Sequence, residues 1–498
     1  MSTTVTDRPQ PRTYGGWRRS RGMGLLGLGP LQTLLVLGAT ALLVIAGTVS
    51  VQALTVLAPP CLLVLVGVLA RYDGVPLAHG LLVRLRWWYA TTRGYTSYRS
   101  GLMVADEHAW GLPGVLACTR LLSVSDPLGD FGVVHNSRAG HYTVTLHCAA
   151  TSTWLADPDE GDTWVATWGA WLAALGHHVA VHHVAVTVDS APDPGTRLAD
   201  TISRRILPTA PASAVAILRE LVTTSPAVSA DVDTRVSITF RHPAHVPVSD
   251  TTTALDDIAR MLPGLQNALG GCGVVVLRRA TAADLAGLVR VAYDPMMRGD
   301  VDRILALRGG TELARWLDWD TAGPVSAEEH FDRYEHDTGI SVSWAWHEAP
   351  RQNVHADVLA RLLAPGPYAK RVTLLYRPLP AAEAARTVER EVNAAAFRAS
   401  LNRAQRRDES ARDATDRARA QRAAFEEAVG AGIGFMTLLV TVTVTDPEHL
   451  PRAVADIEAR ADIAKVRLRR MHASQAAGFA MTLPCGLYPP TLARTWPR

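Results

Sequence analysis

The sequence predicts an α+β cytoplasmic region with mostly antiparallel sheets and a long helical arm, preceded by a two-helix transmembrane hairpin. Three observations lead to this fold class: an early block without charged residues, alternating strand and helix patterns after it, and one long segment of helix-forming composition. The 498 residues then divide into six parts. These are a basic cytoplasmic leader (1–21), the hairpin (22–70), a basic and aromatic juxtamembrane segment (71–100), the α+β domain (101–380), the helical arm (381–430) and a C-terminal strand–helix–strand part of the α+β domain (431–498).

The hairpin is predicted from a run of residues without Asp, Glu, Lys, Arg or His between Gly22 and Ala70. One helix needs roughly 20 apolar residues to cross a hydrocarbon layer of ~30 Å, so the run suits two spans. We expect helices at Leu31–Thr48 and Leu54–Ala70, with Pro59 and Pro60 kinking the second helix or marking its first turn. A secretory signal peptide is the alternative, but the block is too long for one and no small-residue cleavage site leads into a polar segment.

The flanking charges predict the orientation of this hairpin, because arginines hold a loop on the cytoplasmic side of a membrane. The leader and the juxtamembrane segment each carry five arginines and one aspartate, whereas the chain after residue 100 is net acidic. We therefore expect a multi-pass protein of the bacterial inner (plasma) membrane with both termini in the cytoplasm. The side chains expected at the membrane interface are Trp17, Arg18, Arg19, Arg21, Arg71, Arg84, Arg86, Trp87, Trp88 and Tyr89.

The stretch from Pro76 to Arg93 mixes leucines and tryptophans with arginines. This composition suits a segment that lies on an anionic lipid surface, with rings at headgroup depth and guanidinium groups among the phosphates. It also suits contact with a nucleic-acid backbone. Its position directly after a predicted span favours membrane lipid as the partner.

The region after residue 100 is predicted to alternate between strands and helices. Helices are expected at Trp164–Leu175, Pro194–Arg205, Ala210–Thr223, Thr251–Leu269, Ala282–Ala292 and Pro451–Arg460. A β-hairpin at Gly132–Cys148 is broken at Asn136–Gly140, and further strands are expected at His177–Val188, Thr234–Phe240, Gly273–Leu277, Ser341–His347, Arg371–Tyr376, Gly434–Thr445 and Lys465–Met471.

The predicted arm, 381–430, changes character along its length. Val388, Val392, Phe397 and Leu401 form an apolar stripe at helical spacing, whereas residues 406–417 are polar on every face. A helix that is polar all round must project into solvent, bridge domains or be loosely ordered. The candidate partner-docking residues are Arg406, Arg407, Asp408, Glu409, Arg412, Asp416 and Arg417. A helical connection without a partner is the alternative.

One glycine motif suggests a nucleotide site. Gly22, Gly24 and Gly27 have the G-x-G-x-x-G spacing of a dinucleotide loop, but that loop requires a preceding buried strand and an acidic residue about 20 positions later. Neither is present, so the stretch is interpreted as an uncharged entry into the first span.

The lysine pattern bears on ATP hydrolysis. A Walker A loop needs a lysine after a glycine, and neither Lys370 nor Lys465 follows one. The stretch Leu438–Glu448 resembles a Walker B strand, but without that loop it is interpreted as a strand whose Asp446 starts the next helix.

Histidines and acidic residues provide two further candidate clusters. His177, His178, His182 and His183 lie in a predicted half-buried strand, where His178 and His182 would be roughly 13 Å apart, too far for one metal ion. The acidic and histidine-rich stretch 328–337 is interpreted as a solvated helix face. The five cysteines are scattered and lack C-x-x-C, which predicts reduced thiols. We therefore expect no catalytic, cofactor-binding or metal-binding residues, no cofactor, and no enzyme.

Several stretches together carry a resemblance to a known family. The leader with Arg12-Thr-Tyr-Gly-Gly-Trp-Arg-Arg, the hairpin, Arg99-Ser-Gly-Leu and Gly111-Leu-Pro-Gly-Val-Leu resemble actinobacterial membrane proteins that accompany conjugation-type secretion ATPases. These proteins are sometimes grouped with the type VII secretion component EccE, and their front end looks like the two-span PrgI subunit. The last third of the chain, through Asp446-Pro-Glu-His-Leu to Met481-Thr-Leu-Pro484, resembles the end of the non-catalytic N-terminal domain of type IV secretion ATPases.

The resemblance implies a function without enzymatic activity. It suggests an inner-membrane structural subunit of a conjugative type IV-like secretion machine that anchors or docks a separate secretion ATPase, because the motor domain that follows in those ATPases is not part of this sequence. Its partners would be membrane lipid, the ATPase, other membrane subunits and copies of itself. Two alternatives stay open: an EccE-like membrane subunit of a type VII system, and a membrane-tethered protein that binds DNA through the basic segment from Arg84 to Arg99.

Overall fold

The computed structural model describes residues 13–15, 29–72, 75–101, 103, 111–151, 157–224, 229–306, 317–350, 352–404, 411–428, 430 and 432–494. The chain forms two compact units. One unit contains the sheet and comprises Met1–Trp17, Ser97–Ala384 and Val429–Arg498, and the other is helical and comprises Arg18–Thr96 and Ala385–Ala428.

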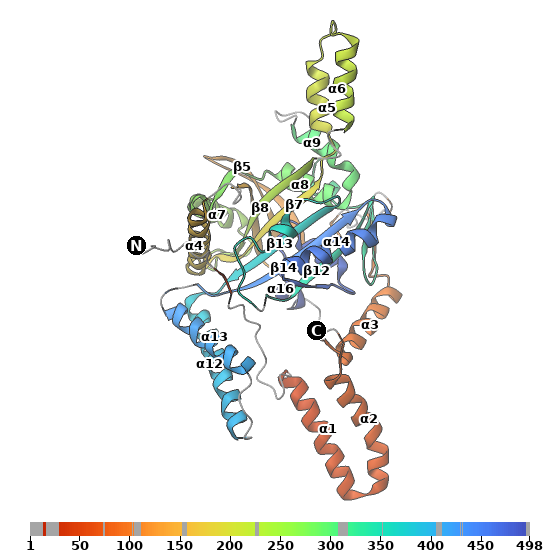
Figure 1. Ribbon diagram of the computed structural model, residues 1–498, viewed down its shortest axis with the longest axis vertical. Coiled ribbons are helices and arrows are strands. Elements are labelled where there is room, and N and C mark those ends of the chain that lie inside the picture. The colour runs from red at the N-terminus through yellow and green to blue at the C-terminus, as the bar shows by residue number, and fades with distance from the viewer. Residues whose placement is uncertain are drawn as a thin grey trace, which may run out of the picture. The chain divides into compact units, whose positions relative to one another are not determined.

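The helical unit begins with two long apolar helices, α1 (Pro30–Val49) and α2 (Val51–Leu69), which run side by side (Figure 1). Both are long and apolar enough to cross a membrane, which confirms the predicted pair of apolar helices. Pro30 occupies the first position of α1, where its missing N–H costs nothing. The turn is shorter than predicted, because Ser50 alone separates the helices and its side chain caps α2 by accepting the N–H of Ala53 at 3.0 Å.

The prolines of the second helix lie elsewhere than its first turn. Pro59 and Pro60 fall inside α2. A short pair of strands, β1 (Arg71–Tyr72) and β2 (Val75–Pro76), then leads into helix α3 (Leu77–Thr92). The predicted arm is helical as expected and forms two helices, α12 (Ala381–Ala404) and α13 (Ala411–Ala428).

The sheet-bearing unit is α+β, and every strand pairing found among its described residues is antiparallel, which confirms the predicted class. The sheet has 13 strands. Its order is β3 (Ser97–Arg99), β10 (Ser326–Glu329), β11 (Tyr334–His336), β12 (Gly339–Glu348), β14 (Gly434–Val444), β13 (Ala369–Pro378), β7 (Val181–Pro192), β8 (Ala230–Arg241), β6 (His141–Ala150), β5 (Gly129–Asn136) and β4 (Thr119–Asp126), with β15 (Arg467–Arg470) paired to β12 and β9 (Val274–Arg279) paired to β6.

One face of this sheet is apolar and is covered by helices. Helices α4 (Pro158–Ala174) and α7 (Thr251–Leu269) pack over β6, β7 and β8, around residues such as Leu146 and Ile238. Helix α14 (Leu450–Ile463) covers β12, β13 and β14, around residues such as Val440 and Trp344. Alternate residues of each strand point to this face, as the period of two requires.

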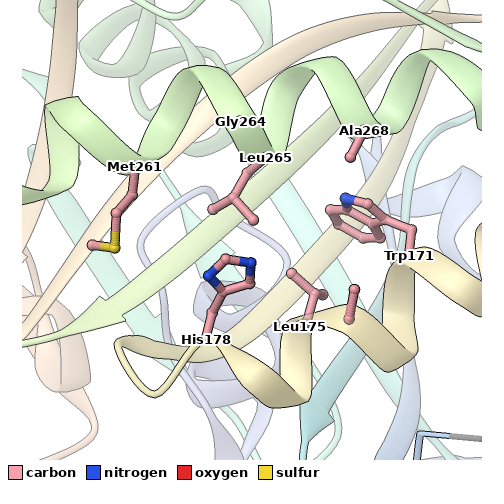
Figure 2. Close-up of a pocket in the computed structure, with 8 residues that line it drawn as sticks. Trp171, Leu175, His178, Met261, Gly264, Leu265 and Ala268 are labelled. Carbon is pink, nitrogen blue, oxygen red and sulfur yellow. The ribbon is translucent and has the colours of Figure 1, made fainter. Parts of the chain in front are cut away.

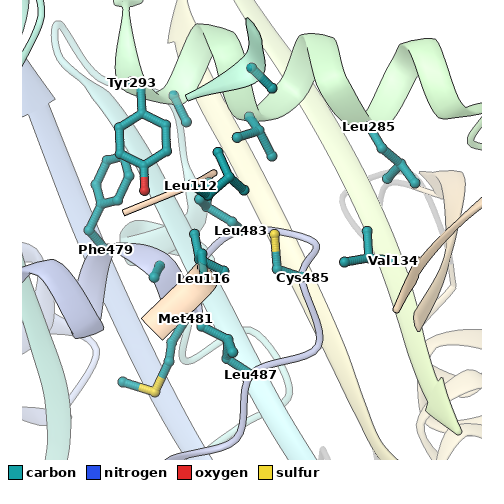
Figure 3. Packing of buried hydrophobic residues seen from close by; sticks show 14 of the residues in the cluster. Leu112, Leu116, Val134, Leu285, Tyr293, Phe479, Met481, Leu483, Cys485 and Leu487 are labelled. Carbon is teal, nitrogen blue, oxygen red and sulfur yellow. The ribbon is translucent and has the colours of Figure 1, made fainter. Parts of the chain in front are cut away.

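The opposite face carries buried hydroxyl groups that bond to one another across neighbouring strands. The pairs are Thr143–Thr239 (3.0 Å), Thr145–Ser237 (2.9 Å), Thr187–Thr373 (2.9 Å), Ser341–Thr443 (2.8 Å) and Ser343–Thr441 (2.9 Å). Helix α8 (Ala282–Tyr293), helix α15 (Gln475–Met481) and the chain that follows α15 cover this face, with Leu483, Cys485 and Leu487 in the apolar cluster (Figure 3).

Most other predicted elements are also present. The helices α5 (Thr196–Arg205) and α6 (Ala212–Thr224) lie where they were expected and project from the sheet as a pair (Figure 1). The structure adds short helices that the sequence did not indicate, namely α9 (Arg298–Ala306), α10 (Trp319–Ala322), α11 (Ala360–Leu363), α15 and α16 (Pro489–Arg494).

The interpretation of residues 328–337 as a helix face is wrong. Strands β10 and β11 form a hairpin here, with Glu328 paired to Glu335 and Glu329 paired to Tyr334. Tyr334 and His336 are buried, and a carboxylate oxygen of Glu329 accepts the backbone N–H of Ala476 at 3.0 Å. The high density of charged residues suggested a face exposed to solvent. In the structure these acidic residues instead alternate with side chains that the sheet buries.

Candidate functional site

The two apolar helices contact each other through a narrow seam. Its buried residues are Ala39 and Ala46 on α1, and Cys61 and Val68 on α2, spaced seven residues apart on each helix. Small side chains at such positions let two helices approach closely. Leucines, valines and isoleucines elsewhere on both helices are exposed, including Leu34 at 68% and Leu63 at 73%. An apolar surface of this extent needs a cover of lipid or protein.

Helix α3 continues this apolar surface on one of its sides. Six exposed residues line that side of the helix: Leu77, Leu81, Leu82, Leu85, Trp88 and Tyr89. At 3.6 residues per turn, Arg84 and Arg86 fall on the two opposite borders of this stripe. An apolar stripe bordered on both sides by long basic side chains is typical of a helix that lies in the plane of a membrane surface.

The structure brings most of the described interface candidates onto or beside this helix. Arg84, Arg86, Trp88 and Tyr89 are exposed on α3, where Trp87 is half-buried, and Arg71 is exposed at β1. The guanidinium of Arg93 lies 5.4 Å from the centre of the Tyr89 ring. Trp17, Arg18, Arg19 and Arg21 lie outside the described residues.

The arm is described in part. Of the predicted apolar stripe, Val388 is buried and Val392 half-buried in α12, whereas the side chains of Phe397 and Leu401 lie outside the described part of the structure. Phe425 of α13 is 69% exposed beside an Arg422–Glu426 ion pair of 2.9 Å. Arg412, Asp416 and Arg417 lie in α13, but their side chains are outside the described part of the structure, as are residues Arg406, Arg407, Asp408 and Glu409 in full.

Sequence reasoning missed a contact made by the leader. Tyr14 pairs with Val354 through two backbone hydrogen bonds of 2.7 and 2.8 Å, and its hydroxyl donates to Asp162 Oδ1 at 2.8 Å. A side chain at Gly15 would collide with Asn353. These bonds fix Tyr14 within the sheet-bearing unit. The aromatic Tyr14 in an otherwise polar segment was the available signal, but nothing local indicated its partner.

The histidines predicted on a half-buried strand are arranged differently. Strand β7 begins at Val181, so His177 and His178 precede it, whereas His182 and His183 are buried within it. An irregularity in the pairing of β7 with β8 at this point brings the two Nδ1 atoms to 2.8 Å. The ring of His141 lies 4.2 Å from that of His182. Among the described residues, no group of three or more His, Cys, Asp or Glu side chains could hold a metal ion.

Burial controls the protonation of this histidine group. It lowers the pKa of His141 to about 4, with Arg241 adding to the effect, and lowers the pKa of His182 to about 3, where His141 and Arg241 add to it. The pKa of the fully buried His183 also falls well below its usual range for the same reason. These rings are therefore neutral at pH 7 and pack as part of the sheet.

A second buried network joins charged residues of β6, β7 and β8. Arg235 donates to Asp233 at 2.8 Å and to Asp189 at 3.1 Å, and His147 bonds to Asp233 at 3.0 Å. Burial alone would raise the pKa of Asp233, but the bond from His147 and the charge of Arg235 outweigh it and hold that pKa well below its usual range. Arg235 of β8 bonds to a carboxylate of its own strand and to one of β7, while His147 of β6 bonds to Asp233, so the network links the three strands.

Comparison with protein-family models gives no match, and comparison with curated proteins gives none. The functional interpretation therefore depends on the geometry of the chain itself.

Proposed function

We propose that this chain is a non-enzymatic subunit of a bacterial inner membrane, anchored by α1 and α2, within a conjugative type IV-like secretion machine. The observation that carries the proposal is the apolar exposure of α1, of α2 and of one side of α3, with arginines along the borders of α3. At a 1.5 Å rise per residue, each of the two long helices spans roughly 30 Å, the thickness of a hydrocarbon layer.

The contact of the leader supports a hairpin with both ends on one side. Tyr14 precedes α1 in the chain, and its partners Val354 and Asp162 follow α2. Segments joined by direct hydrogen bonds must lie on the same side of a membrane. The chain between them therefore crosses an even number of times, and the flanking arginines favour the cytoplasmic side for both ends.

We assign the docking of a separate secretion ATPase to the arm formed by α12 and α13. An exposed phenylalanine beside charged residues is typical of a protein contact, and Phe425 next to Arg422 and Glu426 fits that description. The family resemblance supplies the class of partner, because the last third of the chain resembles the end of the non-catalytic N-terminal domain of type IV secretion ATPases.

Site-specific photo-crosslinking in native cells tests this docking role. A photoreactive residue at Phe425 is expected to capture the type IV-like ATPase encoded with the protein, identified by mass. The same residue at Val248, which is 84% exposed on the sheet-bearing unit, serves as the control and is expected not to capture it. Capture of a type VII ATPase at Phe425 would favour the EccE-like alternative, and capture of neither ATPase at native expression would overturn the docking role.

A further inference from the structure

Helix α3 carries its basic side chains unevenly on the two borders of its apolar stripe. His79, Arg86 and Arg93 are exposed and stand seven residues apart, with Arg93 at the C-cap. Seven residues make almost two full turns, so these side chains form a row along one border, with about 10.5 Å from one to the next. The other border of the helix carries Arg84 alone, and no acidic residue lies between residues 77 and 93. The row of His79, Arg86 and Arg93 is called the basic ridge below.

Contacts with the end of α2 fix where this helix begins. The N–H of Leu77 donates to the carbonyl oxygen of Ala70 at 3.0 Å, and a Cβ atom at Gly67 would lie 3.4 Å from that of Ala78. Figure 1 shows the short connection between the two helices. Because α2 is long and apolar enough to cross a membrane, the start of α3 should lie at the depth of the lipid headgroups.

The remaining side of α3 differs from both the apolar stripe and the basic ridge. Val83, Trp87 and Ala90 lie on the side opposite the stripe and are half-buried. The basic ridge therefore runs between a side that the protein partly covers and a side that suits acyl chains. A side chain in this position reaches the headgroup layer while its helix stays in contact with lipid.

Tyr89 stands beside the basic ridge, between Arg86 and Arg93 along the helix axis. The guanidinium of Arg93 lies 5.4 Å from the centre of its ring. Tyrosine rings favour the headgroup depth of a membrane, and a guanidinium group binds phosphate oxygens through two parallel hydrogen bonds. This arrangement holds two phosphate-binding groups at one depth, on either side of an interfacial ring.

A second apolar surface in this chain lacks such a row. It is the groove between α4 and α7 of the sheet-bearing unit, where Leu175, Met261 and Leu265 line the walls (Figure 2). Of its eight lining residues, His178 alone has a basic side chain, and none is an arginine. The basic ridge therefore sets α3 apart from this groove as a surface that suits an anionic partner.

We propose that the basic ridge binds the headgroup phosphates of anionic phospholipids, so that α3 gathers these lipids around the membrane anchor in preference to zwitterionic ones. The inference rests on the proposed anchor. A zwitterionic headgroup brings a cation of its own close to the arginines, which weakens the attraction to its phosphate. A nucleic-acid backbone also offers phosphates, but it gives the exposed leucines of the stripe no apolar surroundings.

Spin-labelled lipids test this on the full chain, reconstituted in phosphatidylcholine vesicles with a trace of labelled phosphatidylglycerol or labelled phosphatidylcholine. Electron paramagnetic resonance separates lipid that is slowed by contact with the protein from free lipid. The unchanged protein should associate with phosphatidylglycerol about fivefold more strongly than with phosphatidylcholine, the effect of one arginine beside a charged headgroup. Arg86→Gln/Arg93→Gln should lower this ratio below about twofold.

Arg219→Gln/Arg452→Gln is the matched control, because it removes the same charge from exposed positions of α6 and α14. It should keep the ratio of the unchanged protein. Equal association of both lipids with the unchanged protein, or an equal loss of preference in the two double variants, would overturn the proposal.

The same spectra separate a failure of this proposal from a failure of the anchor. Slowed phosphatidylcholine without any preference for phosphatidylglycerol would leave the anchor in place and overturn the lipid preference alone. Absence of slowed lipid of either kind would contradict the anchor, and the proposal with it. If the unchanged protein shows no lipid preference but binds a fluorescent DNA duplex, and Arg86→Gln/Arg93→Gln abolishes that binding, the basic ridge serves nucleic acid and the proposal is wrong.

Discussion

At the scale of single residues, the polar face of the sheet depends on side chains that satisfy one another in the interior. Threonines and serines recur on one face of β6, β8, β12 and β14. The alternation was sufficient to predict strands, because hydroxyl-bearing and β-branched residues suit a pleated surface. It could not indicate that this face is buried, since the same pattern is typical of a strand that faces water.

The buried histidines make stability depend on pH. Burial lowers the pKa of His141 in the folded state to about 4. Below pH 6.5, His141 therefore binds a proton in the unfolded chain but stays neutral in the folded protein until the pH approaches 4. The free energy of unfolding should therefore fall as the pH drops from 7 to 5, by about 2 kcal/mol for this residue alone. His141→Gln should reduce the slope between these pH values in thermal unfolding.

The exposed His177 provides the matched comparison for that experiment. His177→Gln should leave the pH dependence of unfolding as it is in the unchanged protein, because His177 is exposed and lies outside the buried histidine group. Equal slopes for the two variants would contradict the assignment of the acid sensitivity to the buried group.

At the scale of elements, the sequence predicted long elements well and short ones badly. The long uncharged run identified α1 and α2, helical periodicity identified α4 and α7, and dense β-branched runs identified β7, β13 and β14. Strand β4 was missed, as were the short helices α9, α10, α11, α15 and α16, which contain too few residues for a clear helical periodicity. Residues 328–337 were misassigned because their charged side chains alternate with side chains that the sheet buries, and a high density of charge does not reveal that alternation.

The conformation of the chain after α15 depends on close packing against the polar face of the sheet. Gly486 has φ of 64°, and a Cβ atom there would collide with Thr143 Oγ1. Gly486→Ala should therefore lower the free energy of unfolding by about 2 to 4 kcal/mol, the sum of backbone strain and overpacking. Gly140→Ala is the control, because its φ of 63° is nearly the same while the nearest atom is 3.9 Å from the added Cβ. Gly140→Ala should lower the free energy of unfolding by about 1 to 2 kcal/mol. If thermal unfolding gives equal losses for the two variants, the close packing of Gly486 against Thr143 does not contribute to the effect.

At the scale of the whole molecule, pairings between distant segments lie beyond sequence reasoning. Strand β14 inserts between β12 and β13, so it pairs on both sides with segments that precede the arm. The hydrogen bonds from Tyr14 to Val354 are another such pairing. No local pattern specifies these partners. The division into an apolar pair of helices and an α+β region did follow from composition, since it requires no knowledge of pairing.

The central claim is a hairpin anchor with the leader and the sheet-bearing unit on the cytoplasmic side. Single cysteines in intact cells, treated with a maleimide reagent that cannot cross membranes, test it most directly. The sites are Ser50 between α1 and α2, and the exposed Thr13 and Val248 on either side of the hairpin in sequence, with the unsubstituted chain as background. Ser50→Cys should react in intact cells, whereas Thr13→Cys and Val248→Cys should react only after permeabilisation. Labelling of Thr13→Cys and Val248→Cys from opposite sides, or protection of Ser50→Cys in intact cells, would contradict the hairpin.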